Sequence, residues 1–335
     1  MRILYIASIM MAACVAFGSC NDEWKDELYT QMISFKAPVN DKGVCDIYMR
    51  YQSDGTGFYR LPVIVSGTCD NDRDIDVRIG IDNDTLGILN VEKYLHREDL
   101  YYKQLPGNFY SFPSEVCHIP AGKNTQNYII DFNFNGLDMV EKWVLPLSIE
   151  ESPVYAPNMW KGWRKALLNI NLFNDYSGSY SATSMNIYMD GETNDPATIS
   201  KRTAAVVDEN SVFFYAGTVW EEDVNRSRYK VIVTFGPGKK NEDGVITGNL
   251  ELRSGDPDNL MNFKAKGNCT YDIRTEMDLV QPYLKHYYVT MRMEYDYTDF
   301  TSDTSNPVVY NARGSLVMER KINTLIPDED QAIQW

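Results

Sequence analysis

Regular alternation of apolar and polar side chains is the feature that most constrains the fold of this chain. In Tyr128–Phe134, positions 128, 130, 132 and 134 form an apolar face, while Asp131 and Asn133 point the other way. A period of two residues is that of a β-strand with one buried face. Similar runs occur at 75–81, 166–172, 229–235, 287–297 and 316–322. The sequence therefore predicts an all-β fold.

Turn residues and prolines divide these runs into two groups. Turns such as Gly236-Pro237-Gly238 separate strands, and the two prolines of Ser152–Asn158 break strand pairing. We expect an immunoglobulin-like β-sandwich over 31–153, a linker and first strand over 154–175, a second β domain over 176–323 and a tail over 324–335. The second domain is predicted as a barrel, for instance lipocalin-like, or as another sandwich, since alternation is the same in both. One helix is predicted at Asn90–Leu95, with Asn90 as its N-cap.

The N-terminus has the layout of a lipoprotein signal peptide. Arg2 precedes an apolar run from Ile3 to Phe17, which is shorter than the ~20 residues that a membrane-spanning helix needs. The small residues Gly18 and Ser19 then precede Cys20, so residues 1–19 are predicted to be removed and Cys20 to carry the lipid. Cys14 is a competing site. Residues 20–30 are acidic and lack apolar periodicity, which indicates a flexible tether to the membrane.

Composition narrows the range of functions. The chain has 47 acidic and 32 basic residues, a net charge of −15 that repels phosphate backbones, so nucleic acid is not an expected partner. It contains 3 histidines and 23 tyrosines, which favours stacking surfaces over histidine-based chemistry. Motifs for metalloproteases, serine hydrolases and nucleotide binding are missing. We expect no catalysis, no cofactor and no metal. We also expect Cys45, Cys69, Cys117 and Cys269 to be buried free thiols, with at most one disulfide among the three in the first half.

Tryptophans beside charged residues are the first candidates for a binding site. An exposed indole stacks on the apolar face of a sugar ring, so Trp160 and Trp163 form one candidate glycan platform. The alternative is that these two rings pack between the domains. Trp220 with Glu221 is a second candidate, because a carboxylate beside an aromatic ring can accept hydrogen bonds from sugar hydroxyls; an exposed hairpin tip gives the same pattern.

A long strand in the second half supplies the third candidate. In the run 287–297, tyrosines, methionines and a valine occupy one face, and Arg292, Glu294 and Asp296 occupy the other. If the domain is a closed barrel with a polar lumen, these three residues contact a ligand. The favoured alternative is a solvated face with cross-strand pairs.

An aspartate-rich turn, Asp70–Asp76, resembles the start of a calcium loop. The EF-hand pattern fails further on, because Ile75 stands where glycine is required and Ile81 where glutamate is required. The same residues form a suitable turn into a strand, which is the favoured interpretation.

Several segments of the first half resemble a known family. Ile81-Asp82-Asn83-Asp84, Gln104-Leu105-Pro106, Ile119-Pro120-Ala121-Gly122 and Trp143–Ile149 are similar to a Bacteroidetes domain of unknown function that is also found at the N-terminus of surface endo-β-N-acetylglucosaminidases. The second half, with Tyr176-Ser177-Gly178-Ser179-Tyr180 and Tyr295–Asp299, is similar to a C-terminal domain that accompanies it in surface lipoproteins. The acidic tether also resembles the surface-export signal of lipoproteins of this phylum.

The resemblance implies a setting in glycan uptake. We therefore predict a non-catalytic lipoprotein of the outer membrane, exposed on the cell surface, that binds a glycan as an accessory to a carbohydrate-uptake system and its outer-membrane transporter. Two alternatives stay open: an adhesin or assembly subunit that binds protein through strand addition, and a cryptic glycoside hydrolase.

Overall fold

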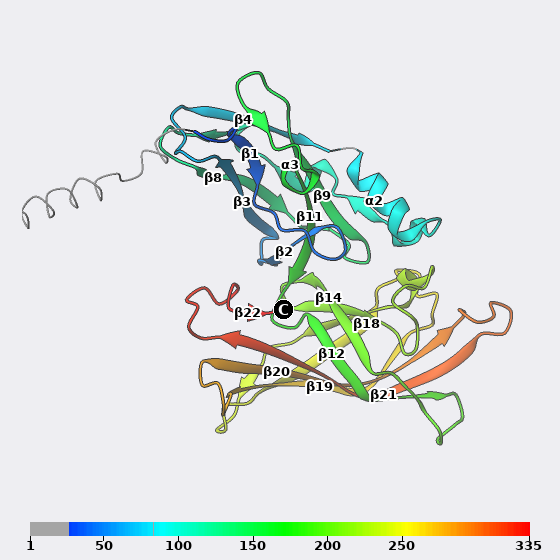
Figure 1. Cartoon of the computed structure of the whole chain (residues 1–335). Helices are drawn as coiled ribbons and strands as arrows, with labels where there is room; N and C mark the ends of the chain where they lie inside the picture. Colours follow the sequence, from blue (N-terminus) through cyan, green and yellow to red (C-terminus); the bar gives the residue numbers. More distant parts are fainter. Residues whose placement is uncertain (1–26, 83) are drawn as a thin grey trace, which may run out of the picture.

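The computed structural model describes residues 27–82 and 84–335 and shows an all-β protein of two domains, a sandwich and a barrel (Figure 1). The predicted lipid site Cys20, its competitor Cys14 and most of the tether lie outside the described residues. No helix within the described ranges is long and apolar enough to cross a membrane.

Two sheets packed face to face form the first domain. One sheet has the order β10-β1-β3-β8-β6, and the other has the order β2-β11-β9-β4-β7, with β5 also paired to β9. The strands are β1 (Met32–Phe35), β2 (Cys45–Arg50), β3 (Thr56–Ser66), β4 (Ile75–Ile81), β5 (Tyr102–Gln104), β6 (Tyr110–Ser111), β7 (Val116–Ile119), β8 (Thr125–Asn133), β9 (Lys142–Ile149), β10 (Ala156–Pro157) and β11 (Lys165–Phe173). Short helical segments connect them: α2 (Thr85–Tyr94), η2 (Glu98–Leu100), η3 (Gly107–Phe109) and α3 (Lys161–Arg164).

The alternating apolar residues of the strands form the core of this sandwich, as predicted. The even-numbered residues of β8 from Tyr128 to Phe132, followed by Phe134, are at most 3% exposed and pack against the opposite sheet. Cys45 and Cys117 are buried free thiols of the same core, and burial raises their pKa values to about 11 and about 12. These thiols act as small apolar side chains.

The chain re-enters the sandwich after the proline segment. Strand β11 lies between β2 and β9, parallel to β2 with Leu168 opposite Cys45 and antiparallel to β9. The run 166–172 therefore belongs to the sandwich sheet that contains β2 and β9, and it does not lead into the second domain. The crossing to the barrel comes later, between Phe173 and Gly178.

The helix predicted at Asn90–Leu95 is present but begins five residues earlier, at Thr85. Helix α2 begins at Thr85 with Asp84 at the N-cap, and the carboxylate of Asp82 accepts hydrogen bonds from the N–H groups of both. Asn90 is not a cap. Its buried amide donates to the Tyr102 carbonyl and accepts from the Tyr102 N–H, each at 2.8 Å, which fastens the helix to β5.

The second domain is a closed antiparallel barrel, which settles the choice between barrel and sandwich. Eight strands follow one another around it, and the last pairs with the first. They are β12 (Gly178–Met189), β14 (Lys201–Asp208), β15 (Ser211–Tyr215), β16 (Lys230–Phe235), β18 (Ile246–Ser254), β19 (Lys264–Met277), β20 (Leu284–Asp299) and β21 (Val308–Asn323). The short strands β13 (Ala197–Thr198), β17 (Lys239–Lys240) and β22 (Ile333–Gln334) extend it, and η4 (Arg226–Tyr229) precedes β16.

Large side chains fill the interior of the barrel. Tyr180, Tyr295 and Tyr297 are at most 1% exposed, and Phe214 and Met291 pack in the same cluster. A barrel of eight strands is just wide enough for its own side chains to occupy the centre. The interior is therefore a core, and space for a ligand must be sought elsewhere.

Candidate functional site

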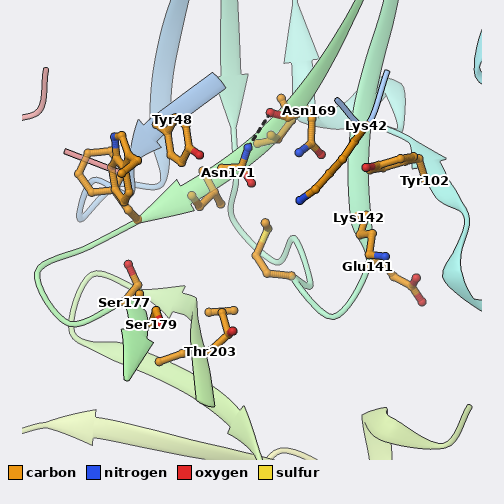
Figure 2. A pocket seen from close by; sticks show the side chains of 18 of the residues that line it. Lys42, Tyr48, Tyr102, Glu141, Lys142, Asn169, Asn171, Ser177, Ser179 and Thr203 are labelled. Carbon is orange, nitrogen blue, oxygen red and sulfur yellow. Dashed lines mark hydrogen bonds between the residues drawn. The ribbon is translucent and has the colours of Figure 1, made fainter. Parts of the chain in front are cut away.

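A cleft of about 640 Å³ opens between the sandwich and the barrel. In Figure 1 the seam runs beneath β2 and β11 and above β14 and β22. The sandwich wall comes from β2, β11, the start of β9 and the α2–β5 region, and the barrel wall comes from the start of β12, from β14 and from Trp335 (Figure 2). Both domains are thus needed to form the cleft.

A stacked aromatic pair stands at one end of the cleft. The rings of Tyr48 and Trp335 are nearly parallel, with centroids 4.3 Å apart, and Phe173 meets the indole edge-on at 4.9 Å. Tyr48 points out of the sandwich because its neighbours Ile47 and Met49 take the buried positions of β2. Tyr48 is 44% exposed and Trp335 is 54% exposed, so both residues are partly open to solvent.

Two asparagines form the middle of the sandwich wall. Asn169 and Asn171 occupy outward positions of β11, between the core residues Leu168, Ile170 and Leu172. Both amide NH₂ groups donate to the carboxylate of Asp46, at 2.6 and 3.1 Å. Within the part of the chain that the structure describes, neither amide oxygen accepts a hydrogen bond. Each is available to a hydroxyl or N–H donor in the cleft.

Tyrosines and lysines occupy the other end. The ammonium of Lys142 lies 4.9 Å from the centre of the Tyr94 ring and 5.9 Å from that of Tyr102, and it donates to the Tyr94 hydroxyl at 3.3 Å. The ammonium of Lys93 lies 5.5 and 5.6 Å from the same two rings. Lys42, Lys142 and Tyr102 all line this part of the cleft (Figure 2). Burial raises the pKa of Tyr102, so its hydroxyl stays protonated.

The barrel contributes small hydroxyl side chains. Ser177 and Ser179 lie at the start of β12, and Thr203 lies on β14, whose inward positions Arg202 and Ala204 are buried. Figure 2 shows these three residues on the barrel wall, across the cleft from Asn169 and Asn171. The two walls together offer ring faces, amide oxygens, hydroxyls and ammonium groups.

Polar contacts fix the two domains around this cleft. Arg226, whose side chain is 9% exposed, donates to the carbonyl of Asp99 at 2.7 Å and lies 3.9 Å from the carboxylate of Glu141. Lys230 forms an ion pair with Asp138 at 2.6 Å. These bonds join η4 and β16 of the barrel to loops of the sandwich, so they hold the cleft walls at a set separation.

Trp220 and Glu221 do not line the cleft, although the neighbouring Glu222 does. The indole of Trp220 is 66% exposed. The carboxylate of Glu221 accepts hydrogen bonds from the N–H and the hydroxyl of Thr203, at 3.0 and 3.4 Å. The next residue, Glu222, lines the cleft, and its carbonyl accepts a bond from Arg97 of the sandwich at 2.7 Å.

Trp160 and Trp163 lie outside the cleft. They flank the start of α3, and their residues are 74% and 49% exposed. The alternative that these rings pack between the domains is therefore wrong. Their part in binding a glycan stays a prediction.

The third predicted group lies on the outside of the barrel. Val289, Met291, Met293, Tyr295 and Tyr297 of β20 face the interior, so a polar lumen is excluded and that expectation is wrong. Arg292 forms an ion pair with Asp272, Asp296 with Lys266 at 2.6 Å, and Asn311 donates to Glu294 at 3.2 Å. This is the cross-strand pairing of the favoured alternative.

The aspartate turn shows no metal geometry. Asp70 accepts from Asn124 at 2.7 Å, Asp74 from the Ala121 N–H at 2.9 Å, and Asp76 contacts His118 at 2.7 Å. Over residues 27–82 and 84–335, no three His, Cys, Asp or Glu side chains are grouped to hold a metal ion. The carboxylates serve instead to fasten the β4 and β7–β8 loops together.

Sequence reasoning missed the central residues of the cleft: Tyr48, Asn169, Asn171 and Trp335. One signal was available, because Asn169 and Asn171 are the two polar positions inside the apolar run 166–172. No comparable signal existed for Tyr48 and Trp335, which meet only because the end of the chain returns to the sandwich.

Comparisons with known proteins agree with this architecture. A domain of unknown function, DUF4973, matches residues 24–153, and a model described as a C-terminal domain matches residues 164–317. A multidomain protein including DUF1735 from Bacteroides ovatus is 43% identical, with a TM-score of 0.80 over 91% of this chain and 100% of its own. A protein of unknown function from the same species is 36% identical, with a TM-score of 0.79 over 93% and 97% of the two chains.

A third solved structure carries a functional description. An auxiliary nutrient binding protein from Bacteroides thetaiotaomicron is 34% identical, with a TM-score of 0.76 over 92% of this chain and 100% of its own. No curated protein matches the chain. The predicted resemblance is confirmed: the chain belongs to the family of two-domain Bacteroides proteins in which this β domain of unknown function is followed by a C-terminal β domain.

Proposed function

We propose that this protein is a non-catalytic, lipid-anchored accessory of a carbohydrate-uptake system and that the cleft between its domains binds the glycan. The observation that carries the proposal is the pair Tyr48 and Trp335, two half-exposed stacked rings at the end of a cleft. The C–H groups of a sugar ring pack against such a face, and the amide oxygens of Asn169 and Asn171 accept bonds from its hydroxyls.

The carboxylates of the cleft support binding over hydrolysis. A glycosidase needs two carboxyl groups about 5 to 10 Å apart on either side of the scissile bond. Of the two glutamates in the cleft lining, Glu141 is already paired with Lys103 at 2.8 Å. The relative described as an auxiliary nutrient binding protein supports the same choice. Release of sugar products from a glycan panel would identify a hydrolase instead.

The binding test uses the mature chain without its signal peptide. Affinity gel electrophoresis against a panel of polysaccharides should show retardation with at least one, and calorimetry should then give its affinity. Trp335→Ala should weaken that affinity at least about tenfold, or ~1.4 kcal/mol, because the ring platform is lost. The matched control is Trp160→Ala, which removes an exposed tryptophan outside the cleft.

The two variants separate the cleft from the loop site predicted from sequence. Loss of binding in Trp160→Ala with normal binding in Trp335→Ala would move the site to α3. Retardation by no glycan, together with capture of a specific protein partner from the outer membrane, would favour the adhesin or assembly subunit.

The anchor is tested separately. Cys20→Ala should release the protein from the membrane fraction, and mass spectrometry of the mature N-terminus should find lipid on Cys20. Lipid on Cys14 would show that the competing site is used. Protease digestion of intact cells should degrade the protein if it faces outward, and co-purification with an outer-membrane transporter should report the expected complex.

A further inference from the structure

The charge of the cleft is opposite to that of the chain. The protein carries a net charge of −15, yet four lysines and two glutamates line the cleft. Three of the lysines, Lys42, Lys93 and Lys142, come from the sandwich, and Lys201 comes from the barrel. Positive charge therefore faces the cleft from both domains.

The carboxylates close to these lysines are occupied by other partners. Glu141 is paired with Lys103 at 2.8 Å, and Asp46 accepts bonds from three asparagine amides, including Asn40 at 2.6 Å. Among the residues that the structure describes, none of the four cleft lysines has a carboxylate within 4.0 Å. Their charge is left for solvent or for a ligand.

Two of the ammonium groups are held in place by aromatic rings. Lys93 and Lys142 both lie within 6 Å of the centres of the Tyr94 and Tyr102 rings. Cation–π contacts orient the two ammoniums without neutralising them. Two like charges gathered on one pair of rings repel each other, and an anion bound between them and the cleft would relieve that repulsion. A concave wall of this kind also focuses the local potential.

Resting on the proposed function, we infer that the ligand is an anionic glycan, one that carries carboxylate or sulfate groups. Its acidic group contacts Lys93 and Lys142 at the tyrosine end of the cleft, and a sugar ring stacks on the Tyr48–Trp335 pair at the other end. Lysine suits this role because its ammonium is a compact point charge that donates hydrogen bonds to carboxylate and sulfate oxygens alike.

The test compares matched glycans and matched lysines. Hyaluronan carries uronate without sulfate, chondroitin sulfate carries both, and dextran carries neither. The double variant Lys93→Gln/Lys142→Gln should weaken binding of the anionic glycan about a hundredfold, about tenfold per charge-assisted contact. The control Lys123→Gln/Lys264→Gln removes the same charge from exposed positions outside the cleft and should leave binding within about twofold.

The outcomes distinguish this inference from the proposed function. Preference for hyaluronan assigns the carboxylate, and preference for chondroitin sulfate assigns the sulfate. Binding of a neutral glycan that depends on Trp335 and ignores Lys93 and Lys142 overturns the inference and leaves the proposed function intact. Equal binding of single-stranded DNA with a similar charge density also overturns it, because charge without sugar would then suffice. If no glycan of either class binds, the proposed function itself fails.

Discussion

The barrel interior and the cleft beside it differ in how much of their volume side chains occupy: the interior is filled, and the cleft is open. Inside the barrel, Tyr295 and Tyr297 are at most 1% exposed, and the space is filled by the protein's own side chains. In the cleft, Tyr48 and Trp335 keep about half of their surface exposed. In this family member the barrel supplies a packed core and one wall, and the cleft that we propose as the ligand site lies where the two domains meet.

The difference follows from how each hollow is made. In a small closed barrel every strand directs alternate side chains inward. These side chains pack closely and exclude water. The cleft instead lies between the outer surfaces of two separately folded domains. Polar contacts such as that of Arg226 with Asp99 join these domains beside the cleft. We therefore expect substitutions in the barrel interior to lower stability, and substitutions in the cleft to lower ligand affinity.

The largest expected effect is on the barrel interior. Phe214→Ala removes a side chain that is 2% exposed and packs near Tyr295. It should lower the free energy of unfolding by about 3–5 kcal/mol, measured by denaturant titration, because it leaves a cavity. Phe214→Leu keeps most of the volume and should cost clearly less. A loss below about 1 kcal/mol in the alanine variant would mean that the interior is not close-packed.

The next effect is on binding rather than stability. Asn171→Ala removes an amide oxygen from the cleft wall and should weaken glycan affinity about tenfold, equivalent to ~1.4 kcal/mol, while the free energy of unfolding falls by about 1 kcal/mol or less. The matched control is Asn127→Ala, an exposed asparagine on β8. Equal affinities of the two variants in calorimetry would remove Asn171 from the site.

A smaller effect is expected on the outer face of the barrel. Arg292→Ala breaks an ion pair with Asp272 on a side chain that is 56% exposed. Stability should change by less than about 1 kcal/mol, as for other exposed pairs, and glycan affinity should be unchanged. Affinity reduced as much as in Asn171→Ala would show that this polar face, predicted as a candidate from sequence, contributes to the site after all.

The smallest effect depends on pH and lies away from the cleft. His286 of β20 contacts Asp278 at 3.0 Å and Glu319 at 2.5 Å, and these two carboxylates raise its pKa. A raised pKa in the folded state means that the protonated imidazole stabilises the fold below its ordinary pKa of 6.5, and that this contribution is lost as the pH rises through the higher folded value.

His286→Gln should therefore lower the melting temperature more at pH 6 than at pH 9. His96→Gln, at an exposed position, is the control and should show no such pH dependence. A deficit of equal size at both pH values would show that His286 acts by packing and not by charge. Glycan affinity should be the same in both variants, since neither residue lines the cleft.

Much of the fold was predictable because alternation is a local signal. The run 75–81 coincides with β4, and the apolar side of 287–297 is the side that faces the barrel interior. The start of the helix was missed because the side chain that binds its first N–H groups is Asp82, three residues before Thr85. The segment around Asp82 has no apolar periodicity that would predict a helix. The tryptophan candidates were visible in sequence, but their surroundings were not.

By itself, the sequence determined the strands, their buried sides and the two-domain β organisation, since each depends on neighbours along the chain. Only the tertiary structure decided that β12 pairs with β21 to close the barrel and that β11 joins the sandwich beside β2. It also brought Tyr48 against Trp335 and the lysines of both domains to one cleft. These contacts join residues far apart in sequence, and no local period records which distant surfaces will meet.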